Sequence, residues 1–441
     1  MRIERSLRLA LNPDEAWHLA LASAGSFAGA WQQALTVHHP PLLILLEYLC
    51  GPLTNTETGA RLIVMVAGAL APLVVFFWLR DRVGVTGAMV ALVLLEFSPR
   101  WISLSCHVRS YALAWLFVAL TLYWLDQRWL IAAGAAWCCA ALSDYSVALM
   151  SPAITIYGWS RLPRTLWLKW VACTAVVLGI FGFLYWAQVR HFVGNQTARE
   201  FAWIQGGLPE GDLMSFLPRA FLRQFVYFFG NVPLGVAALS IFLAALAWDR
   251  SWWSLAMLPF VVASLAAALE LFPFGQTRHT SILAFSIVIP LSAAAEKLIR
   301  RPVWAMAALA LVPVWWSAAS PDRYDLDPLA LDPVAHRAAA AYLPRFAPVL
   351  ATDQVAFLLR YYSRGLSGLP PVIVSSGSWT FTGATDLRQR VHEFRRAQSI
   401  PDEAPVWVAE GGFYPAIGPG MQVQASRHFG TLWIYQALRG F

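Results

Sequence analysis

The chain has 441 residues, of which 58% are hydrophobic and only 13% are charged. Soluble domains carry roughly 45–50% apolar and about 25% charged residues, so the composition excludes an ordinary soluble protein and indicates a polytopic membrane protein. The net charge of +7 does not indicate a nucleic-acid partner, because the basic residues are scattered at expected helix ends instead of forming a patch.

The chain opens with a basic segment and then reaches Asn12-Pro13-Asp14-Glu15, where two carboxylates stand side by side just before the membrane-embedded body. Carboxylates at a membrane surface are costly without a partner or a task, so this pair indicates a functional site. The alternative is that Asp14 caps a helix that begins near Glu15.

The topology derived below places Asp14 on the outer side of the membrane, yet arginines stand at positions 2, 5 and 8. These arginines would have to cross the membrane without a helix. We therefore expect the recorded start to lack a first transmembrane segment. The alternative is an amphipathic amino-terminal helix that lies on a membrane surface.

About ten apolar runs follow that are long enough, or nearly long enough, for the roughly 20 residues of a spanning helix. They cover 58–80, 86–104, 108–126, 129–143, 144–160, 167–188, 231–248, 252–271, 279–297 and 303–319. Arginine and lysine residues fall at every second loop between these runs. By the positive-inside rule those loops are cytoplasmic, so the opposite loops and everything after residue 320 face outward.

We predict a different structure for each of two outward-facing segments, one before the spans and one between them. Residues 10–57 form the first external loop, in which 40–52 is too short to span and is predicted as an interfacial or re-entrant helix. Residues 190–230 contain several glycines and aromatic residues, which suggests a flap-like loop that closes over a substrate; the alternative is a plain surface loop.

The tail at 320–441 changes character and reads as a small α/β domain, distinct from the transmembrane domain at 1–319. Short apolar runs at 348–352, 371–375, 406–409 and 432–435 predict strands, and 333–343 and 385–398 predict helices. Asp353, Tyr361 and Tyr362 are candidates to line an acceptor site at strand ends. The alternative is a stabilising lid without chemistry.

Four motifs occur in a recognisable order: Asp14-Glu15, His39-Pro40-Pro41-Leu42, Arg109-x-Tyr111 and Pro273-x-Gly275-x-x-Arg278-His279. Over roughly residues 10–300 this set resembles the GT-C superfamily of integral-membrane glycosyltransferases. It is most similar to the protein O-mannosyltransferase and lipid A aminoarabinose transferase group, including its bacterial lipopolysaccharide-sugar transferase branch. The resemblance implies a polyprenyl-phosphate-linked sugar donor and a GT-C-like fold with an acidic first external loop and an outward soluble domain after the helices. This agrees with the fold expected from hydropathy and charge: about ten spanning helices, outer juxtamembrane helices and a small C-terminal α/β domain.

On this resemblance, Asp14 is the candidate catalytic base that takes the proton of the acceptor hydroxyl, with inversion at the sugar carbon. Glu15 cannot share a helix face with Asp14, so it is expected to orient the acceptor or an arginine. His107 and Tyr111 are candidates for orienting the substrate. For His107 the alternative is a neutral packing histidine, and Tyr111 is expected to pack or orient instead of acting as an acid.

Cations are expected to bind the lipid phosphate, which gains charge as it leaves. Arg278 is the first candidate, because its guanidinium can bind phosphate oxygens in a bidentate manner. His279, Arg109 and His39 could complete the phosphate site. The alternatives are that an arginine reaches to lipid headgroups, or that Arg109 pairs with Asp14 or Glu15.

No metal ligand or other cofactor is assigned. Relatives often carry an acidic residue two positions before the arginine of the Arg-x-Tyr motif, where this chain has His107. Divalent cations prefer hard oxygen ligands, so a metal is possible but not favoured.

The sequence thus predicts a glycosyltransferase in the bacterial inner membrane, with its site and C-terminal domain facing the periplasm. Its partners would be a polyprenyl-phosphate-linked sugar, membrane lipids, and a glycan, lipid or protein acceptor. Two other functions stay open: a lipid or glycan transporter or flippase, and a glycan polymer ligase. A transporter would be expected to show internal repeats and charges at mid-helix, and most charges here lie at helix ends.

Overall fold

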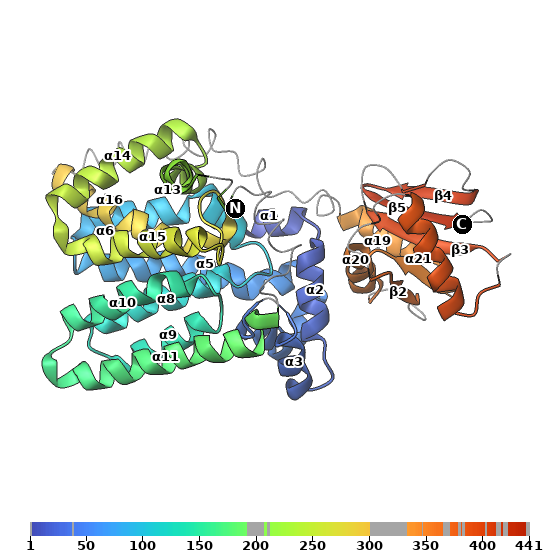
Figure 1. Ribbon diagram of the computed structural model, residues 1–441, viewed down its shortest axis with the longest axis horizontal. Coiled ribbons are helices and arrows are strands. Elements are labelled where there is room, and N and C mark those ends of the chain that lie inside the picture. Colours follow the sequence, from blue (N-terminus) through green and yellow to red (C-terminus); the bar gives the residue numbers. More distant parts are fainter. Residues whose placement is uncertain are drawn as a thin grey trace.

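The computed structural model describes residues 2–37, 39–191, 207–209, 212–299, 333–345, 347–364, 371–377, 381, 384–401, 404–411, 416–417 and 422–437. Three tiers follow one another along the longest axis: a bundle of apolar helices, a layer of short helices across one end, and an α/β domain beyond that layer (Figure 1). This arrangement confirms the predicted fold class. The expected boundary between 319 and 320 lies outside the described residues.

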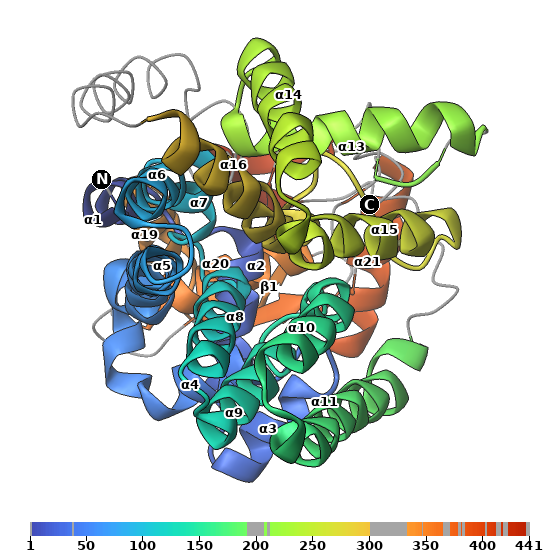
Figure 2. The ribbon, with the colours of Figure 1, turned by 90° about the vertical axis from the view of Figure 1, so that its left-hand side faces the viewer.

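The bundle consists of helices that are apolar on nearly all sides. They are α5 (Glu57–Arg80), α6 (Val85–Glu96), α7 (Pro99–Leu104), α8 (Tyr111–Asp126), α9 (Leu130–Ala141), α10 (Val147–Arg161), α11 (Trp167–Ala187), α14 (Val232–Trp248), α15 (Trp253–Ala268) and α16 (Ala284–Leu298). Figure 2 looks along the bundle, so that α5 and α6 are seen nearly end-on.

Nine of the ten predicted spans fall on described residues, and each coincides with a helix or a pair of helices; the tenth, 303–319, lies outside them. Among the described residues, four helices are individually long and apolar enough to cross a membrane, or five if a bent pair counts as one span. The predicted span 86–104 is broken at its centre, because Ser98 caps a new helix whose first residue is Pro99.

The layer across the end of the bundle, here called the end layer, is built from residues 2–55. It contains α1 (Arg2–Arg8), α2 (Pro13–Ala22), α3 (Phe27–Ala34), α4 (Leu42–Leu49) and the 3₁₀ helix η1 (Gly51–Asn55). Helix α2 lies across the bundle axis, between the bundle and the C-terminal domain (Figure 1). The 8 residues of α4 are far too few to span, in agreement with the prediction that 40–52 does not cross the membrane.

The prediction of a loop over 190–230 is wrong for residues 213–229. Residues Leu213–Phe229 form helix α13, which begins at the Asp212 cap, ends at Gly230 in the left-handed conformation, and meets α14 at a bend of 112°. Helix α13 is seen end-on in Figure 1 and lengthwise in Figure 2, so it runs at right angles to the bundle. Its apolar residues follow a helical period that the loop interpretation overlooked. The glycines at 194, 206 and 211 lie outside the described residues.

The C-terminal domain is a five-stranded sheet in the order β2-β1-β3-β5-β4. The strands are β1 (Val349–Ala351), β2 (Ile373–Ser375), β3 (Val406–Gly411), β4 (Val423–Phe429) and β5 (Leu432–Ala437), and the helices are α19 (Pro333–Tyr342), α20 (Asp353–Ser363) and α21 (Ala384–Ala397). Strand β1 pairs in parallel with β2 and β3, while β5 is antiparallel to its neighbours. All four predicted strands and both predicted helices are present; α20 and β4 were not predicted.

Helix α20 joins the C-terminal domain to the end layer, the layer of short helices across the end of the bundle. The Tyr362 hydroxyl accepts a hydrogen bond from the Leu11 backbone at 3.0 Å, and the Tyr361 hydroxyl donates to the Thr54 carbonyl at 3.1 Å. Both tyrosines are buried, so they do not line an open acceptor site as expected. Asp353 begins α20 and binds Ser375 at the end of β2, which makes it a link within the domain.

Candidate active site

Helix α2 begins with a capping arrangement that leaves Asp14 free for other partners. The Asn12 side chain accepts from the Glu15 backbone at 2.8 Å, and the Glu15 carboxylate accepts from the Asn12 backbone at 2.8 Å. Pro13 occupies the first helical turn, where its missing N–H is not needed. The cap is therefore Asn12, and the alternative that Asp14 caps this helix is wrong.

Asp14 lies between two arginines that come from distant parts of the chain. Arg109, in the turn before α8, forms an ion pair with Asp14 Oδ2, and Arg278 Nη2 lies 3.4 Å from the same oxygen. Arg278 begins the 3₁₀ helix η5 (Arg278–Leu283), which leads into α16. The structure thus brings together the candidate base and two candidate phosphate ligands at the end of the bundle that faces the C-terminal domain.

The two arginines differ in how far they are exposed. The Arg109 side chain is 6% exposed and is enclosed by its partners, whereas the Arg278 side chain is 37% exposed. An approaching anion can therefore reach Arg278 more readily than Arg109. Burial alone would raise the pKa of Asp14, but the charges of Arg109 and Arg278 outweigh burial and hold this pKa below its usual value.

Two histidines contact Arg109 through the terminal nitrogen that does not face Asp14. Arg109 Nη1 lies 2.7 Å from His39 Nε2 and 3.2 Å from His18 Nε2. Burial, together with the Arg109 charge, lowers the pKa of His18 to about 3 and that of His39 well below its usual value. Both rings are therefore neutral at physiological pH. His38, which precedes His39 in the motif, lies outside the described residues.

His18 is a site residue that the sequence reasoning missed. It stands four residues after Asp14 on α2, and residues at this spacing share a helix face. That spacing was the available signal, and it predicts that His18 and Asp14 point in the same direction.

Glu15 points away from the site and is wholly buried. Its two oxygens accept from Arg61 Nε at 2.9 Å and Arg61 Nη2 at 2.8 Å, and Oε1 also accepts from the Val108 backbone at 2.8 Å. Glu15 was expected to orient either the acceptor or an arginine. The structure shows it in contact with an arginine, and its buried side chain does not face space that an acceptor could occupy. The reason is the one expected for a helix: neighbouring residues face different sides.

Tyr111, His279 and His107 lie around this centre. Tyr111 is buried at the start of α8, with its ring centroid 6.3 Å from that of His279. His107 is partly buried, and its Nδ1 lies 2.9 Å from the Ser103 carbonyl oxygen. The structure therefore places every sequence-predicted site residue near Asp14 or in contact with one of its partners. Their roles stay predictions, as does the view that no metal is required.

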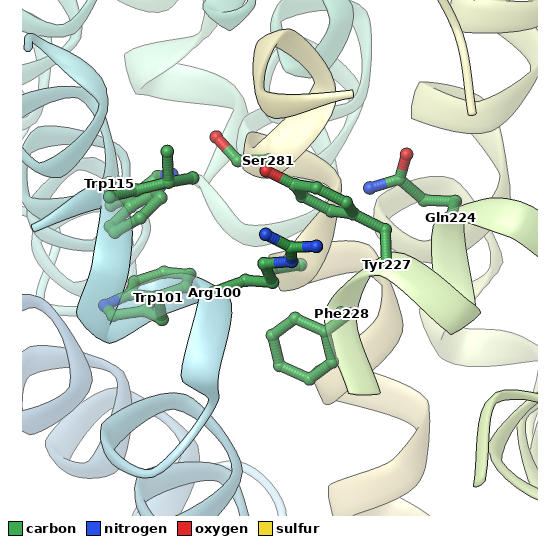
Figure 3. A pocket seen from close by; sticks show the side chains of 9 residues that line it. Arg100, Trp101, Trp115, Gln224, Tyr227, Phe228 and Ser281 are labelled. Atoms are coloured by element: carbon green, nitrogen blue, oxygen red, sulfur yellow. The ribbon is translucent and has the colours of Figure 1, made fainter. Parts of the chain in front are cut away.

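A small cavity lies deeper in the bundle, between α7, α8, α13 and η5 (Figure 3). Its lining includes Arg100, Trp101, Trp115, Tyr227 and Ser281. Its volume of about 10 Å³ holds roughly one water molecule and is much too small for a sugar ring.

Comparison with known proteins gives a family match and a fold match. Residues 38–186 match the family described as dolichyl-phosphate-mannose-protein mannosyltransferase. The structure resembles ArnT from Cupriavidus metallidurans in the apo state, with a TM-score of 0.54 and 16% identity, over 99% of this chain and 95% of that one. It also resembles the same protein bound to undecaprenyl phosphate, with a TM-score of 0.55 and 17% identity, over 100% and 96%. No curated protein matches significantly.

Proposed function

The chain is a multi-pass membrane protein with the GT-C glycosyltransferase fold, and from that premise we propose that it transfers a sugar from a polyprenyl-phosphate carrier to an acceptor hydroxyl. The observation that carries this proposal is the ionised Asp14 carboxylate held between Arg109 and Arg278 at the outer end of the bundle. The binding of undecaprenyl phosphate by ArnT supports a carrier of this class.

In the proposed reaction, Asp14 accepts the proton of the acceptor hydroxyl as the hydroxyl oxygen attacks C1 of the sugar. The C1–oxygen bond to the carrier breaks, and its electron pair goes to the departing lipid phosphate. Attack from the side opposite the leaving group inverts the configuration at C1. One carboxylate within reach of the acceptor is sufficient for this single displacement.

The two arginines have different tasks in this proposal. Arg278 is the phosphate ligand, because it is the more exposed and is only 3.4 Å from Asp14. Arg109 is the fixed counterion of Asp14, because its guanidinium is buried among Asp14 and two imidazoles. His279 stands next to Arg278 in the chain and is placed to add a contact to the phosphate.

Donor binding also changes the basicity of Asp14. A donor phosphate competes with Asp14 for Arg278, so Asp14 loses one of the two positive charges that lower its pKa. The carboxylate therefore becomes a stronger base when the donor is in place. This coupling favours proton transfer in the complex over proton transfer in the empty site.

We place the enzyme in the bacterial inner membrane with its site toward the periplasm. The distribution of basic loops supports this orientation, because it puts α2 and the C-terminal domain on the side opposite the positively charged loops. The acceptor would reach Asp14 from that side, and a hydroxyl of a glycan, lipid or protein fits the chemistry.

Transfer in reconstituted vesicles tests the proposal. Polyprenyl-phosphate sugars are supplied with crude envelope acceptors to the wild type, Asp14→Asn and Arg278→Ala. We expect Asp14→Asn to lose at least about a hundredfold in kcat, and Arg278→Ala to lose transfer and carrier-phosphate binding. Asp81→Asn and Arg80→Ala, an exposed ion pair at the opposite end of α5, serve as matched controls that keep activity.

Two results would count against this function. The first is full transfer activity in Asp14→Asn, which would show that Asp14 is not the catalytic base. The second is movement of labelled carrier lipid across the vesicle membrane without any sugar transfer, unaffected by Asp14→Asn, which would favour the flippase alternative.

A further inference from the structure

Arg109 is enclosed on three sides by groups that accept hydrogen bonds. Its Nη2 faces Asp14, and its Nη1 faces His39 Nε2 at 2.7 Å and His18 Nε2 at 3.2 Å. The two imidazole rings lie 5.0 Å apart between centroids and are tilted by 44°. A guanidinium has only donors, so each Nε2 that faces it acts as an acceptor and carries no proton.

This arrangement fixes the tautomer of His18. With Nε2 as the acceptor, the ring hydrogen is on Nδ1, and Nδ1 is buried without a hydrogen-bond partner among the described residues. A buried donor without an acceptor costs about 1–3 kcal/mol. His18 is itself 1% exposed, so water at the molecular surface does not satisfy this donor.

A position that only fills space would be occupied more stably by an apolar side chain. The neighbours of His18 on its own helix, Ala16, Leu19 and Ala22, are apolar and buried. An imidazole with an unsatisfied nitrogen at such a position indicates that its other nitrogen has a task. The group in contact with that nitrogen is Arg109.

We infer that His18 is a positioning residue, which acts through Arg109 and keeps its guanidinium directed at Asp14 instead of at the donor phosphate. The inference rests on the proposed function. It divides the cations of the site: Arg109 stays with the base because both of its terminal nitrogens face acceptors, and the phosphate is left to Arg278. Loss of the His18 acceptor frees one Arg109 donor and lets the guanidinium move from Asp14 toward the phosphate.

The charged groups around the contact between His18 and Arg109 determine how a displacement of Arg109 can be measured. His18 faces Arg109, Asp14 and Glu15, and His39 faces Arg109 and Arg278 as well as the neighbouring His279. The Arg109 charge lowers the pKa of Asp14 as well as those of His18 and His39, and Asp14 is the proposed base among them. If Arg109 moves away, the pKa of Asp14 rises, and the acid limb of the rate profile moves to higher pH.

The experiment compares His18→Leu with His18→Gln in the reconstituted transfer assay, with kcat, donor KM and the pH profile measured for each. The glutamine carbonyl oxygen takes the place of Nε2 as an acceptor, whereas leucine removes the acceptor. We expect His18→Leu to lower kcat by about tenfold to a hundredfold, with its acid limb at higher pH. His18→Gln is expected to restore most of kcat and the wild-type acid limb.

His392→Leu, at an exposed position on α21, is the control for loss of a histidine, and thermal unfolding checks that each variant is folded. If His18→Leu does not fold, His18→Phe replaces it, since phenylalanine keeps a planar ring but has no hydrogen-bond acceptor. A wild-type pH profile in the apolar variant, or no recovery in His18→Gln, overturns the inference while leaving the proposed function intact. Absence of transfer by the wild type overturns both.

Discussion

Replacing Arg61 by methionine tests whether a buried ion pair fixes the helix that carries Asp14. Arg61 lies on α5 with 1% of its side chain exposed, and Glu15, its partner on α2, has 0%. The guanidinium also donates to the carbonyls of Ser6, Leu9 and Ala10, at 2.8–3.1 Å. One side chain therefore joins α5 to α2 and to the segment before it.

The expected cost follows from what the substitution leaves behind. Arg61→Met buries the Glu15 charge without a cation and removes the donor of three carbonyls. Removing one partner of a buried pair typically costs about 3–5 kcal/mol of unfolding free energy. The double variant with Glu15→Gln has no such isolated charge, so it should be less destabilised than the sum of the single variants by up to about 3 kcal/mol.

Denaturant titration of the purified protein in detergent micelles measures these free energies. Arg80→Met is the matched control, since Arg80 and its partner Asp81 are both nearly half exposed and should contribute less than about 1 kcal/mol. If Arg61→Met unfolds at the same denaturant concentration as Arg80→Met, or if the double-mutant cycle shows no coupling, the ion pair does not hold α2.

Two further predictions concern neighbouring groups. Burial and the Glu15 charge raise the pKa of Glu47 from 4.5 to about 8, so the folded state holds a proton that the unfolded state loses above pH 4.5, and stability falls as pH rises from 4.5 to 8. The free energy of unfolding of Glu47→Gln should therefore exceed that of the wild type by about 3 kcal/mol at pH 7, and the two should be equal near pH 4.5. An equal increase at both pH values would contradict the proposed titration of Glu47. Tyr362→Phe leaves the buried Leu11 N–H without its acceptor and should cost about 1–3 kcal/mol, detected as faster proteolytic release of the C-terminal domain. Tyr342→Phe in the same domain is the control, and identical cleavage rates in the two variants would contradict the docking role.

The tiers of this fold could be predicted because hydropathy and charge are local signals. Each predicted span on described residues coincides with apolar helices, and the strands at 349–351 and 406–411 were visible as apolar runs between turns. Helix α13 was missed because its arginines and Pro218 hid an amphipathic period. Helix α20 was missed because its apolar residues alternate with charged and aromatic ones that only tertiary contact with α2 explains.

The candidate site could be predicted only in part. Motif order indicated that Asp14, Arg109 and Arg278 belong together, although they are separated by up to 264 positions. It did not indicate that Arg109 is enclosed by histidines, because a sequence does not show which cation faces a carboxylate and which faces solvent. The position of Arg61 could have predicted its contact, because a single arginine inside an apolar helix requires a buried partner, which is Glu15.

The neutral state of His18 and His39 has a consequence for the electrical character of the reaction. With these imidazoles uncharged, Asp14 and the two arginines sum to one positive charge, which matches the single negative charge of a phosphodiester donor. In the proposed transfer the proton passes to Asp14 as the phosphate gains its second negative charge, so the site is electrically neutral before and after the step. Transmembrane voltage acts on a reaction only through net charge displaced along the field, at about 2.3 kcal/mol per elementary charge and 100 mV. Glycosyl transfer at this site should therefore proceed at the same rate in energised and de-energised membranes.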